Sequence, residues 1–391
     1  MVTILATEQV PIKLWLDTLD GEALAQAKNL ANLPFVHSHV AIMPDAHMGY
    51  GMPIGGIMAA DGVVVPNAVG VDIGCGMCAV QTSLRHIDTG RLKKILGLIR
   101  KAVPVGFMHH RKKQGEEFMP DPPAGVSLDE LTVVRREYDS ARTQVGTLGG
   151  GNHFIEIQRG DDGYIWLMIH SGSRNLGLKV ATFYNRLAVE LNGRLGPEIP
   201  KKWQLACLPA DSDEGRAYLR EMNYCVDFAL ANRKLMMDRV LALLDQVAGP
   251  FALERFINIA HNYARLEEHF GKNVYVHRKG ATSAQRGEEG IIPGSQGAPS
   301  YIVRGLGNPD SFCSCSHGAG RRLGRKQAQR SLDLKKERRT LERRGILHAI
   351  RGKRDLDEAP GAYKDIDQVI DSQRDLVEVT VRLRPLAVVK G

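Results

Sequence analysis

Six segments, far apart in the sequence and most of them containing glycine, carry residues that could bind a metal ion or attack a phosphate. They centre on Asp45, on Asp72 with Cys75, on His153, on His170, on His261 and on His317. Glycine lets the backbone approach a ligand closely. Thiolate, imidazole and carboxylate together are typical ligands of transition metals. The sequence therefore predicts a transition-metal site beside a site for an anion such as phosphate.

The strongest metal signal is the glycine-rich loop in which Asp72 and Cys75 lie three residues apart. A thiolate can bridge two metal ions, and His153, His170 and His261 are the best candidates for the imidazole ligands. Two metal ions about 3.5–4 Å apart are a common arrangement for phosphoryl chemistry. A lone histidine in an apolar segment is more often a hydrogen-bonded core residue, but the five residues together favour a metal centre. Ligand type alone points first to zinc.

The segment Ser316-His317-Gly-Ala-Gly-Arg321-Arg322 combines a histidine, small residues and two arginines. The small residues allow backbone N–H groups to approach a phosphate, and the arginines add positive charge. His317 could be a nucleophile, a metal ligand or a hydrogen-bond donor to phosphate. The loop from Pro293 to Gly297, with Ser300, is of the same polar, flexible kind, although it could equally be an ordinary turn. A Walker-type P-loop is absent from the sequence.

A polar loop at residues 106–125 holds His109, His110, Arg111, Lys112 and Lys113. The sequence from Lys112 to Gly115 matches formally the Lys-x-x-Gly pattern that nucleotidyl-transferring ligases commonly use. Four-residue matches arise easily by chance, and the charged surroundings favour a solvated loop.

Composition places the chain among soluble globular proteins with an excess of positive charge. The formal net charge is +8 and the pI is about 9.1, which favours a polyanionic partner such as RNA or DNA, although many soluble enzymes are mildly basic. The six cysteines are too sparse for a disulfide framework. No segment approaches the ~18 apolar residues that a membrane span requires. We therefore expect a cytoplasmic protein that does not enter a membrane.

The elements expected to position these loops are strands and tight turns interrupted by one long helical block. The run from Tyr164 to Ile169 predicts a buried strand that delivers His170 into the site. Residues 178–248 have helical periodicity, the basic segment 321–344 is also expected to be helical, and Leu376–Leu386 alternates like a strand.

The candidate site residues lie on both sides of the helical block. We therefore expect one α/β (mixed α+β) unit over residues 1–391, in which residues 178–248 form a helical insertion. Mixed β-sheets should lie at its centre and helices outside. The strand order cannot be read from the sequence, and the distant site residues imply many non-local contacts.

From Met43 to Gly391 the chain resembles the RtcB family of RNA ligases, whose motifs it carries in that family's order. The matching segments are Val69-Gly-Val-Asp72-Ile-Gly-Cys75-Gly-Met77, Gly151-Asn152-His153-Phe-Ile-Glu156, His170-Ser-Gly-Ser-Arg174, Ser316-His317-Gly-Ala-Gly-Arg321 and Ala362-Tyr363-Lys-Asp-Ile-Asp367. Several such motifs together are highly specific. The fold that the resemblance implies is a single RtcB-like catalytic unit.

The resemblance also implies an activity. The family joins an RNA end with a 2′,3′-cyclic phosphate or 3′-phosphate to a 5′-hydroxyl end, with GTP and Mn²⁺, in RNA repair or tRNA splicing. Carried over by motif, Cys75, His153 and His170 would bind one manganese ion, and Asp72, Cys75 and His261 would bind the second. His317 would become guanylylated, and Asp45 matches a family carboxylate near the site. The implied metal is thus manganese and not zinc.

The same resemblance outlines a GTP pocket. Its residues would be Asn152, His153, Phe154, Ile155, Glu156, His261, Asn262, Pro293, Gly294, Ser295, Gln296, Ser300, His317, Gly318, Ala319, Gly320, Tyr363 and Lys390. Tyr363 could stack on guanine and Lys390 could contact its edge or a phosphate. Because termini usually fray, a functional Lys390 predicts that the tail is pinned in the pocket.

Three positions depart from the family's usual pattern. Gln296 stands where methionine is common, Asn175 replaces a frequent glycine, and Gly324 stands where serine is expected. These differences bear on nucleotide affinity and RNA preference and leave the chemistry intact. The expected assembly is a monomer, with an archease-like activator as a further partner.

The run of arginines and lysines from Arg321 to Arg344 is the strongest candidate for an RNA-facing surface, although a solvated helix face explains many of these charges. Two other functions are compatible with the same residues. One is a two-metal phosphatase or nuclease, which does not need His317 as a nucleophile. The other is a non-catalytic RNA-binding protein with a structural metal.

Overall fold

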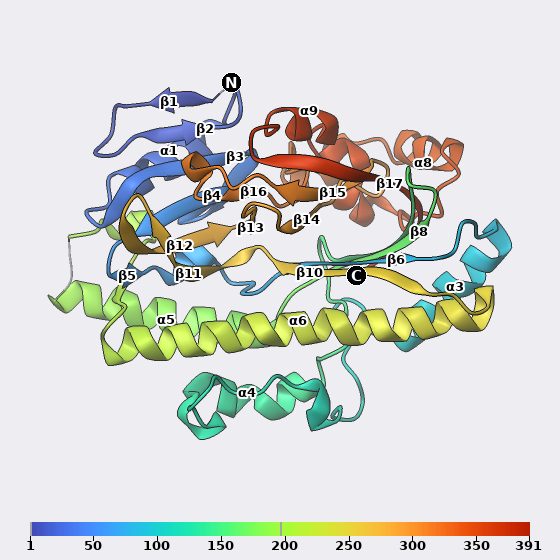
Figure 1. The fold of residues 1–391 in the computed structure, drawn as a ribbon, viewed down its shortest axis with the longest axis horizontal. Helices are drawn as coiled ribbons and strands as arrows, with labels where there is room; N and C mark the ends of the chain where they lie inside the picture. The colour runs from blue at the N-terminus through green and yellow to red at the C-terminus, as the bar shows by residue number, and fades with distance from the viewer. Residues whose placement is uncertain (1, 196–197) are drawn as a thin grey trace.

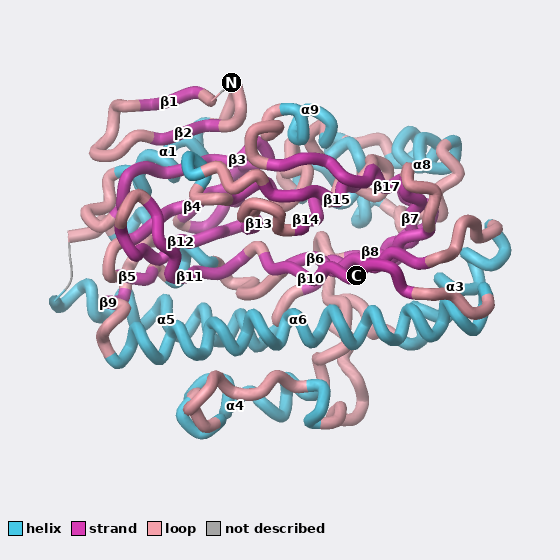
Figure 2. Tube along the Cα trace, viewed as in Figure 1, coloured by secondary structure: helices cyan, strands magenta, loops and turns pink. Residues whose placement is uncertain are grey.

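Two large β-sheets form the centre of the computed structural model, which describes residues 2–195 and 198–391, and helices lie outside them (Figures 1 and 2). The first sheet has the strand order β1-β2-β3-β4-β12-β11. Its strands are β1 (Thr3–Leu5), β2 (Ile12–Leu14), β3 (Val36–Tyr50), β4 (Met52–Ala60), β12 (Lys272–Lys279) and β11 (Asn262–His269). Strands β2 and β3 pair in parallel, and β3, β4, β12 and β11 pair antiparallel in turn.

The second sheet has the order β10-β6-β8-β7-β17-β15-β14, with antiparallel neighbours throughout. Its strands are β10 (Leu253–Ala260), β6 (Gly76–Thr82), β8 (Ile165–Ser171), β7 (Phe154–Gly160), β17 (Val377–Lys390), β15 (Ser300–Gly305) and β14 (Glu289–Ile292). Two short pairs complete the strands: β13 (Ala281–Ser283) with β16 (Ser314–Ser316), and β5 (Val63–Val64) with β9 (Leu208–Pro209). The mixed α/β class predicted from the sequence is confirmed.

Strand β8 shows why this sheet is central. All of its residues are buried, as expected of an apolar run that is covered on both faces. The predicted strand over Tyr164–Ile169 is confirmed, but it begins one residue later and continues through His170 to Ser171. The predicted C-terminal strand is likewise confirmed, and β17 runs four residues further, to Lys390.

The predicted helical block consists chiefly of α5 (Arg174–Leu195) and α6 (Asp213–Ala248). Helix α6 has 36 residues and lies along one face of the strands (Figure 1). It begins where the Ser212 side chain accepts a hydrogen bond from the backbone N–H of Gly215, and ends at Gly249, whose φ is +90°.

Helix α6 is held against the second sheet by apolar packing. Its residues Met236 and Val240 belong to the same buried cluster as Leu167 and Ile169 of β8. Burial of such side chains is the main force that fixes a helix on a sheet. That this helical block is an insertion within a single unit stays a prediction.

The other helices surround the sheets. They are α1 (Gly21–Ala31), α2 (Pro66–Val69), α3 (Thr89–Ala102), α4 (Thr132–Arg142), α7 (Arg325–Ser331), α8 (Leu334–Arg343) and α9 (Ile366–Asp371). Short 3₁₀ helices cover Glu116–Phe118, Leu128–Glu130, Lys201–Trp203, Pro309–Ser311, Lys353–Glu358 and Pro360–Ala362. The basic segment 321–344 is helical as predicted, in two pieces. Within the described ranges, no helix is both long and apolar enough to cross a membrane.

Candidate functional site

The sheet topology brings the predicted metal ligands together at one end of neighbouring strands. Cys75 directly precedes β6, His153 directly precedes β7, and His170 lies near the end of β8, which pairs with both of those strands. In the register, His170 lies opposite Met77 on one side and Phe154 on the other. His261 follows β10, which pairs with β6 on its far side. Neighbouring strand ends therefore gather ligands that are far apart in the sequence.

Cys75, His153 and His170 form a compact cluster whose ligand atoms all lie within 4.8 Å of one another. The Cys75 Sγ atom is 3.4 Å from His153 Nε2 and 3.3 Å from His170 Nε2. Asp72 Oδ2 lies 3.3 Å from His153 Nε2, and the His261 ring centroid is 5.2 Å from that of His170. All five predicted ligands are thus brought together.

The backbone orients two of these imidazole rings. His153 Nδ1 lies 2.9 Å from the Leu148 carbonyl oxygen, and His170 Nδ1 lies 3.2 Å from that of Asn152. A carbonyl oxygen can only accept, so Nδ1 donates in both contacts, and in His170 this leaves the Nε2 lone pair directed toward Cys75. This is the usual way in which a protein fixes the tautomer of a metal-binding histidine.

Burial favours the neutral form of the ligands. It lowers the pKa values of His170 and His261 well below the usual range, so both imidazoles are unprotonated at neutral pH. Burial, with nearby Asp72, raises the pKa of the Cys75 thiol well above its usual range. A metal ion bound here must therefore displace the thiol proton, which makes binding pH-dependent. One thiolate, three imidazoles and one carboxylate form a donor set that suits a transition metal.

His317 lies at the edge of this cluster, where its ring centroid is 4.7 Å from that of His261. Its Nδ1 atom is 2.7 Å from Oδ2 of Asp45, a fully buried carboxylate. The backbone N–H groups of His317 and Gly318 donate to the same oxygen. Burial alone would raise the pKa of Asp45, but the hydrogen bond from His317 and the nearby charge of Lys364 outweigh it and lower that pKa. With Nδ1 held by the carboxylate, Nε2 of His317 keeps its lone pair.

Asp45 reaches His317 because strand β3 is irregular at this point. The register between β3 and β4 shifts between Ile42 and His47, as at a β-bulge, which re-aims side chains. The Lys364 side chain donates to the backbone carbonyls of Pro44 and Ala46, on both sides of Asp45. Lys364 therefore holds the backbone on both sides of Asp45, and this fixes the position of the Asp45 carboxylate.

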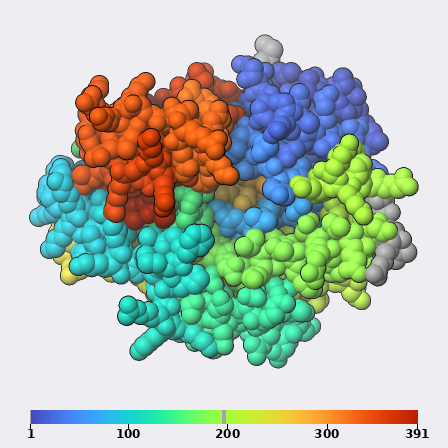
Figure 3. Space-filling view, turned by 180° about the vertical axis from the view of Figure 1, so that it is seen from behind, coloured from blue at the N-terminus to red at the C-terminus, as the bar shows by residue number. Residues whose placement is uncertain are grey.

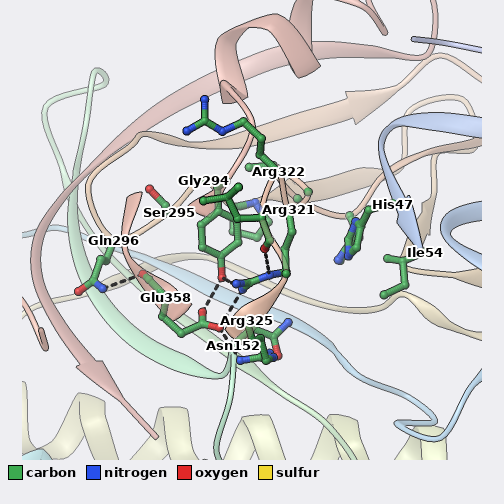
Figure 4. A pocket seen from close by; sticks show the side chains of 18 of the residues that line it. His47, Ile54, Asn152, Gly294, Ser295, Gln296, Arg321, Arg322, Arg325 and Glu358 are labelled. Carbon is green, nitrogen blue, oxygen red and sulfur yellow. Dashed lines mark hydrogen bonds and ion pairs between the residues drawn. The ribbon is translucent and has the colours of Figure 1, made fainter. Parts of the chain in front are cut away.

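A cavity of about 580 Å³ opens beside His317, which is large enough for a nucleotide (Figure 4). The predicted pocket residues that line it are Asn152, Phe154, Glu156, Pro293, Gly294, Ser295, Gln296, His317, Gly318, Ala319, Gly320, Tyr363 and Lys390. In Figure 3, the surface is hollowed between the orange C-terminal segment and the blue N-terminal segment.

The other predicted pocket residues lie behind this lining. His153 and His261 belong to the metal cluster. The Ser300 hydroxyl accepts hydrogen bonds from the Gly294 N–H and the Gln158 side chain, and so supports the lining from behind. Asn262 braces the backbone, since it donates to the Asp72 carbonyl and accepts from the Gly280 N–H. Ile155 packs in the hydrophobic core on the other face of β7.

Glu358 is the main site residue that sequence reasoning missed. Its buried carboxylate pairs with Arg321, Arg325 and Lys390 at 3.1, 2.7 and 2.7 Å, and Tyr363 donates its hydroxyl proton to it (Figure 4). Burial would raise the pKa of Glu358, but Lys390 and Arg325 outweigh it and lower it to about 2. The carboxylate thus ties the C-terminal residues to the wall of the cavity. In the sequence, only its nearness to Tyr363 hinted at this role.

Of the three departures from the family pattern, only Gln296 makes side-chain contacts that explain the residue found there. Gln296 joins two segments, because its side chain donates to the Glu358 carbonyl and accepts from the Ala349 N–H. The Asn175 backbone N–H donates to the side-chain oxygen of Gln144. Gly324 precedes α7, where a Cβ would meet nothing within 4 Å.

A cluster of candidate metal ligands, a histidine beside a buried carboxylate and a nucleotide-sized cavity are the features expected of an enzyme that acts on phosphate groups. Comparison with known proteins gives the family: the model described as tRNA-splicing ligase RtcB matches residues 26–391. The chain belongs to the RtcB family of RNA ligases, which are enzymes.

Named relatives match over nearly the whole chain. RNA-splicing ligase RtcB of Escherichia coli K12 is 39% identical, with 99% of each chain covered. RNA-splicing ligase RtcB of Mycobacterium tuberculosis H37Rv is 35% identical over 94% of this chain and all of the relative. tRNA-splicing ligase RtcB of Thermococcus kodakarensis is 33% identical over 94% of this chain and 91% of the relative.

Proposed function

We propose that this protein joins an RNA end bearing a 3′-phosphate or 2′,3′-cyclic phosphate to a 5′-hydroxyl end, by way of a GMP–histidine intermediate. The observation that carries the proposal is the Asp45–His317 pair, 2.7 Å apart, between the metal cluster and the cavity. That geometry leaves His317 Nε2 as a nucleophile with its lone pair free.

In the first step, His317 Nε2 attacks the α-phosphorus of GTP, and pyrophosphate leaves. The N–P bond forms as the P–O bond to pyrophosphate breaks, and Asp45 stabilises the positive charge that develops on the imidazole. A cyclic phosphate must first be opened by water to a 3′-phosphate. The 3′-phosphate then takes GMP from His317, and the 5′-hydroxyl of the second RNA attacks the activated end and releases GMP.

Cys75 would serve both metal ions, with His153 and His170 completing one site and Asp72 and His261 the other. When bound, two Mn²⁺ ions would supply charge stabilisation on the phosphoryl oxygens. Manganese is inferred from family membership, and the donor set would also accept zinc.

The lining suggests how the cavity would hold the nucleotide. Tyr363 offers a ring face for guanine, and Glu156 with Lys390 offers polar atoms for its edge. Gly318, Ala319 and Gly320 would give backbone N–H groups room to approach the phosphates.

The test is incubation with α-labelled GTP and Mn²⁺, followed by a search for an acid-labile label on the protein. Wild type should be labelled, and His317→Asn should not. Nucleotide or RNA hydrolysis without any label would instead support a two-metal hydrolase. RNA binding with neither label nor turnover would support a non-catalytic RNA-binding protein.

A further inference from the structure

The loop of residues 105–113, here the Phe107 loop, lies against the segment that carries His153. The Gly106 N–H donates to the Gly149 carbonyl at 2.8 Å, and the Arg174 side chain donates to the Gly106 carbonyl at 3.3 Å. The Leu148 carbonyl, next to Gly149, orients His153. The loop is therefore fixed to the backbone that positions a metal ligand.

The tip of this loop presents apolar side chains to solvent. Phe107 has 103% of its reference exposure, and Met108 has 57%. The chain after the tip is anchored, because the His110 N–H donates to the Thr143 carbonyl and the His110 ring contacts Arg239. A fully exposed phenyl ring on an anchored loop contributes nothing to the core, which points to a binding role.

The charges around the tip are positive. Arg111 and Lys112 are exposed, and neither has an ion pair with any residue that the structure describes. Lys113 pairs with Asp139, and the nearby Glu116 is paired with Arg142. An exposed aromatic ring among unpaired cations is the combination by which proteins bind single-stranded nucleic acid.

We propose that the Phe107 loop binds the single-stranded RNA close to the end that enters the metal site. Phe107 stacks on a base, and Arg111 and Lys112 contact phosphates. The inference rests on the proposed function for its substrate, and it adds a surface outside the nucleotide cavity. The positive charge favours RNA over a protein partner as the occupant.

The aromatic contact is tested with Phe107→Ala, Phe107→Trp and a matched control, Phe256→Ala, whose ring is 51% exposed on β10. Stacking of one base on an aromatic ring corresponds to roughly a 5- to 150-fold effect on binding. We expect Phe107→Ala to raise KM for the RNA ends by that factor with little change in kcat. Phe107→Trp should have the KM of the wild type, and Phe256→Ala should also leave the KM unchanged.

GTP labelling separates this inference from the proposed function, because labelling of His317 needs no RNA. Phe107→Ala should label like wild type. Direct binding of a fluorescent single-stranded oligoribonucleotide, read by anisotropy, tests the loop even if the wild type fails to label. Unchanged RNA affinity in Phe107→Ala would overturn the inference, as would an effect seen only when a protein partner is present.

The salt dependence of RNA affinity tests the contacts of Arg111 and Lys112 with phosphates. The logarithm of RNA affinity falls linearly with the logarithm of salt concentration, with a slope of about 0.7 per phosphate contact on a single strand. Arg111→Gln and Lys112→Gln should each reduce the slope by about that amount, whereas Lys93→Gln, on exposed α3, should not. If Arg111→Gln and Lys112→Gln gave the same salt slope as the control Lys93→Gln, the proposed contacts of Arg111 and Lys112 with phosphate would be wrong.

Discussion

Glu358→Gln should destabilise the protein strongly, because one buried carboxylate faces three cations. The pKa of Glu358 is lowered from 4.5 to about 2. One pKa unit corresponds to about 1.4 kcal/mol, so the ionised carboxylate contributes about 3 kcal/mol at neutral pH. Glutamine keeps the shape and removes the charge, leaving Arg321, Arg325 and Lys390 without their shared partner.

The sign of the pH dependence follows from the lowered pKa. The contribution is fully present above pH 4.5 and is lost as the pH falls toward 2. The free energies of unfolding of wild type and Glu358→Gln, measured by urea titration, should therefore differ by about 3 kcal/mol at pH 7. The difference should shrink by about 1.4 kcal/mol per pH unit below pH 4.5.

Asp357→Asn is the matched control. Asp357 also pairs with Arg325, but that arginine side chain is 43% exposed, so the pair should contribute only about 0–1 kcal/mol. Equal losses in the two variants would refute the reasoning, because they would show that the convergence of cations on Glu358 adds nothing. A difference that stays constant between pH 7 and pH 3 would refute the electrostatic origin.

Three further predictions concern metal binding, the C-terminal residues and the buried carboxyl group of Glu156. Cys75→Ser should weaken Mn²⁺ binding, measured by calorimetry, by more than about 100-fold, whereas Cys78→Ser, in the hydrophobic core, should spare it. Deletion of Lys390 and Gly391 should abolish labelling by α-labelled GTP, and normal labelling would show that the tail is dispensable. Burial raises the pKa of Glu156 to about 7, so its charge opposes folding increasingly from pH 4.5 to 7. Glu156→Gln should therefore be more stable than wild type at pH 8, by up to about 3 kcal/mol in urea titration, and equal to it below pH 4.5.

The clustering of the predicted metal ligands could be anticipated because each lies within two residues of a glycine or at the end of an apolar run. His170 is the clearest case, since the apolar run before it favours a buried strand, which the structure confirms. Glu358 was not predictable, because its role depends on Arg321, Arg325 and Lys390, which other segments bring to it. In the sequence it is one of several acidic residues between Asp355 and Glu358.

The strand order was also beyond sequence reasoning. Strand β17 lies between β7 and β15, so the last strand of the chain pairs with one that begins at Phe154. The alternation of apolar and polar residues shows which face of a strand is buried, but it does not show which other strand pairs with it. Register is decided by packing across the sheet, which only the folded chain contains.

The position of β17 explains how a residue next to the C-terminus can belong to a binding site. Its pairing with β7 continues to the end, where Lys390 lies opposite Phe154. A strand that is paired along its length does not fray, so the usual objection to a functional terminus does not apply. Because His153 directly precedes Phe154, the same register that holds Lys390 at Glu358 also fixes the distance between the cavity and the metal cluster. The pairing of β17 with β7 therefore links the wall of the cavity to the strand that begins directly after His153.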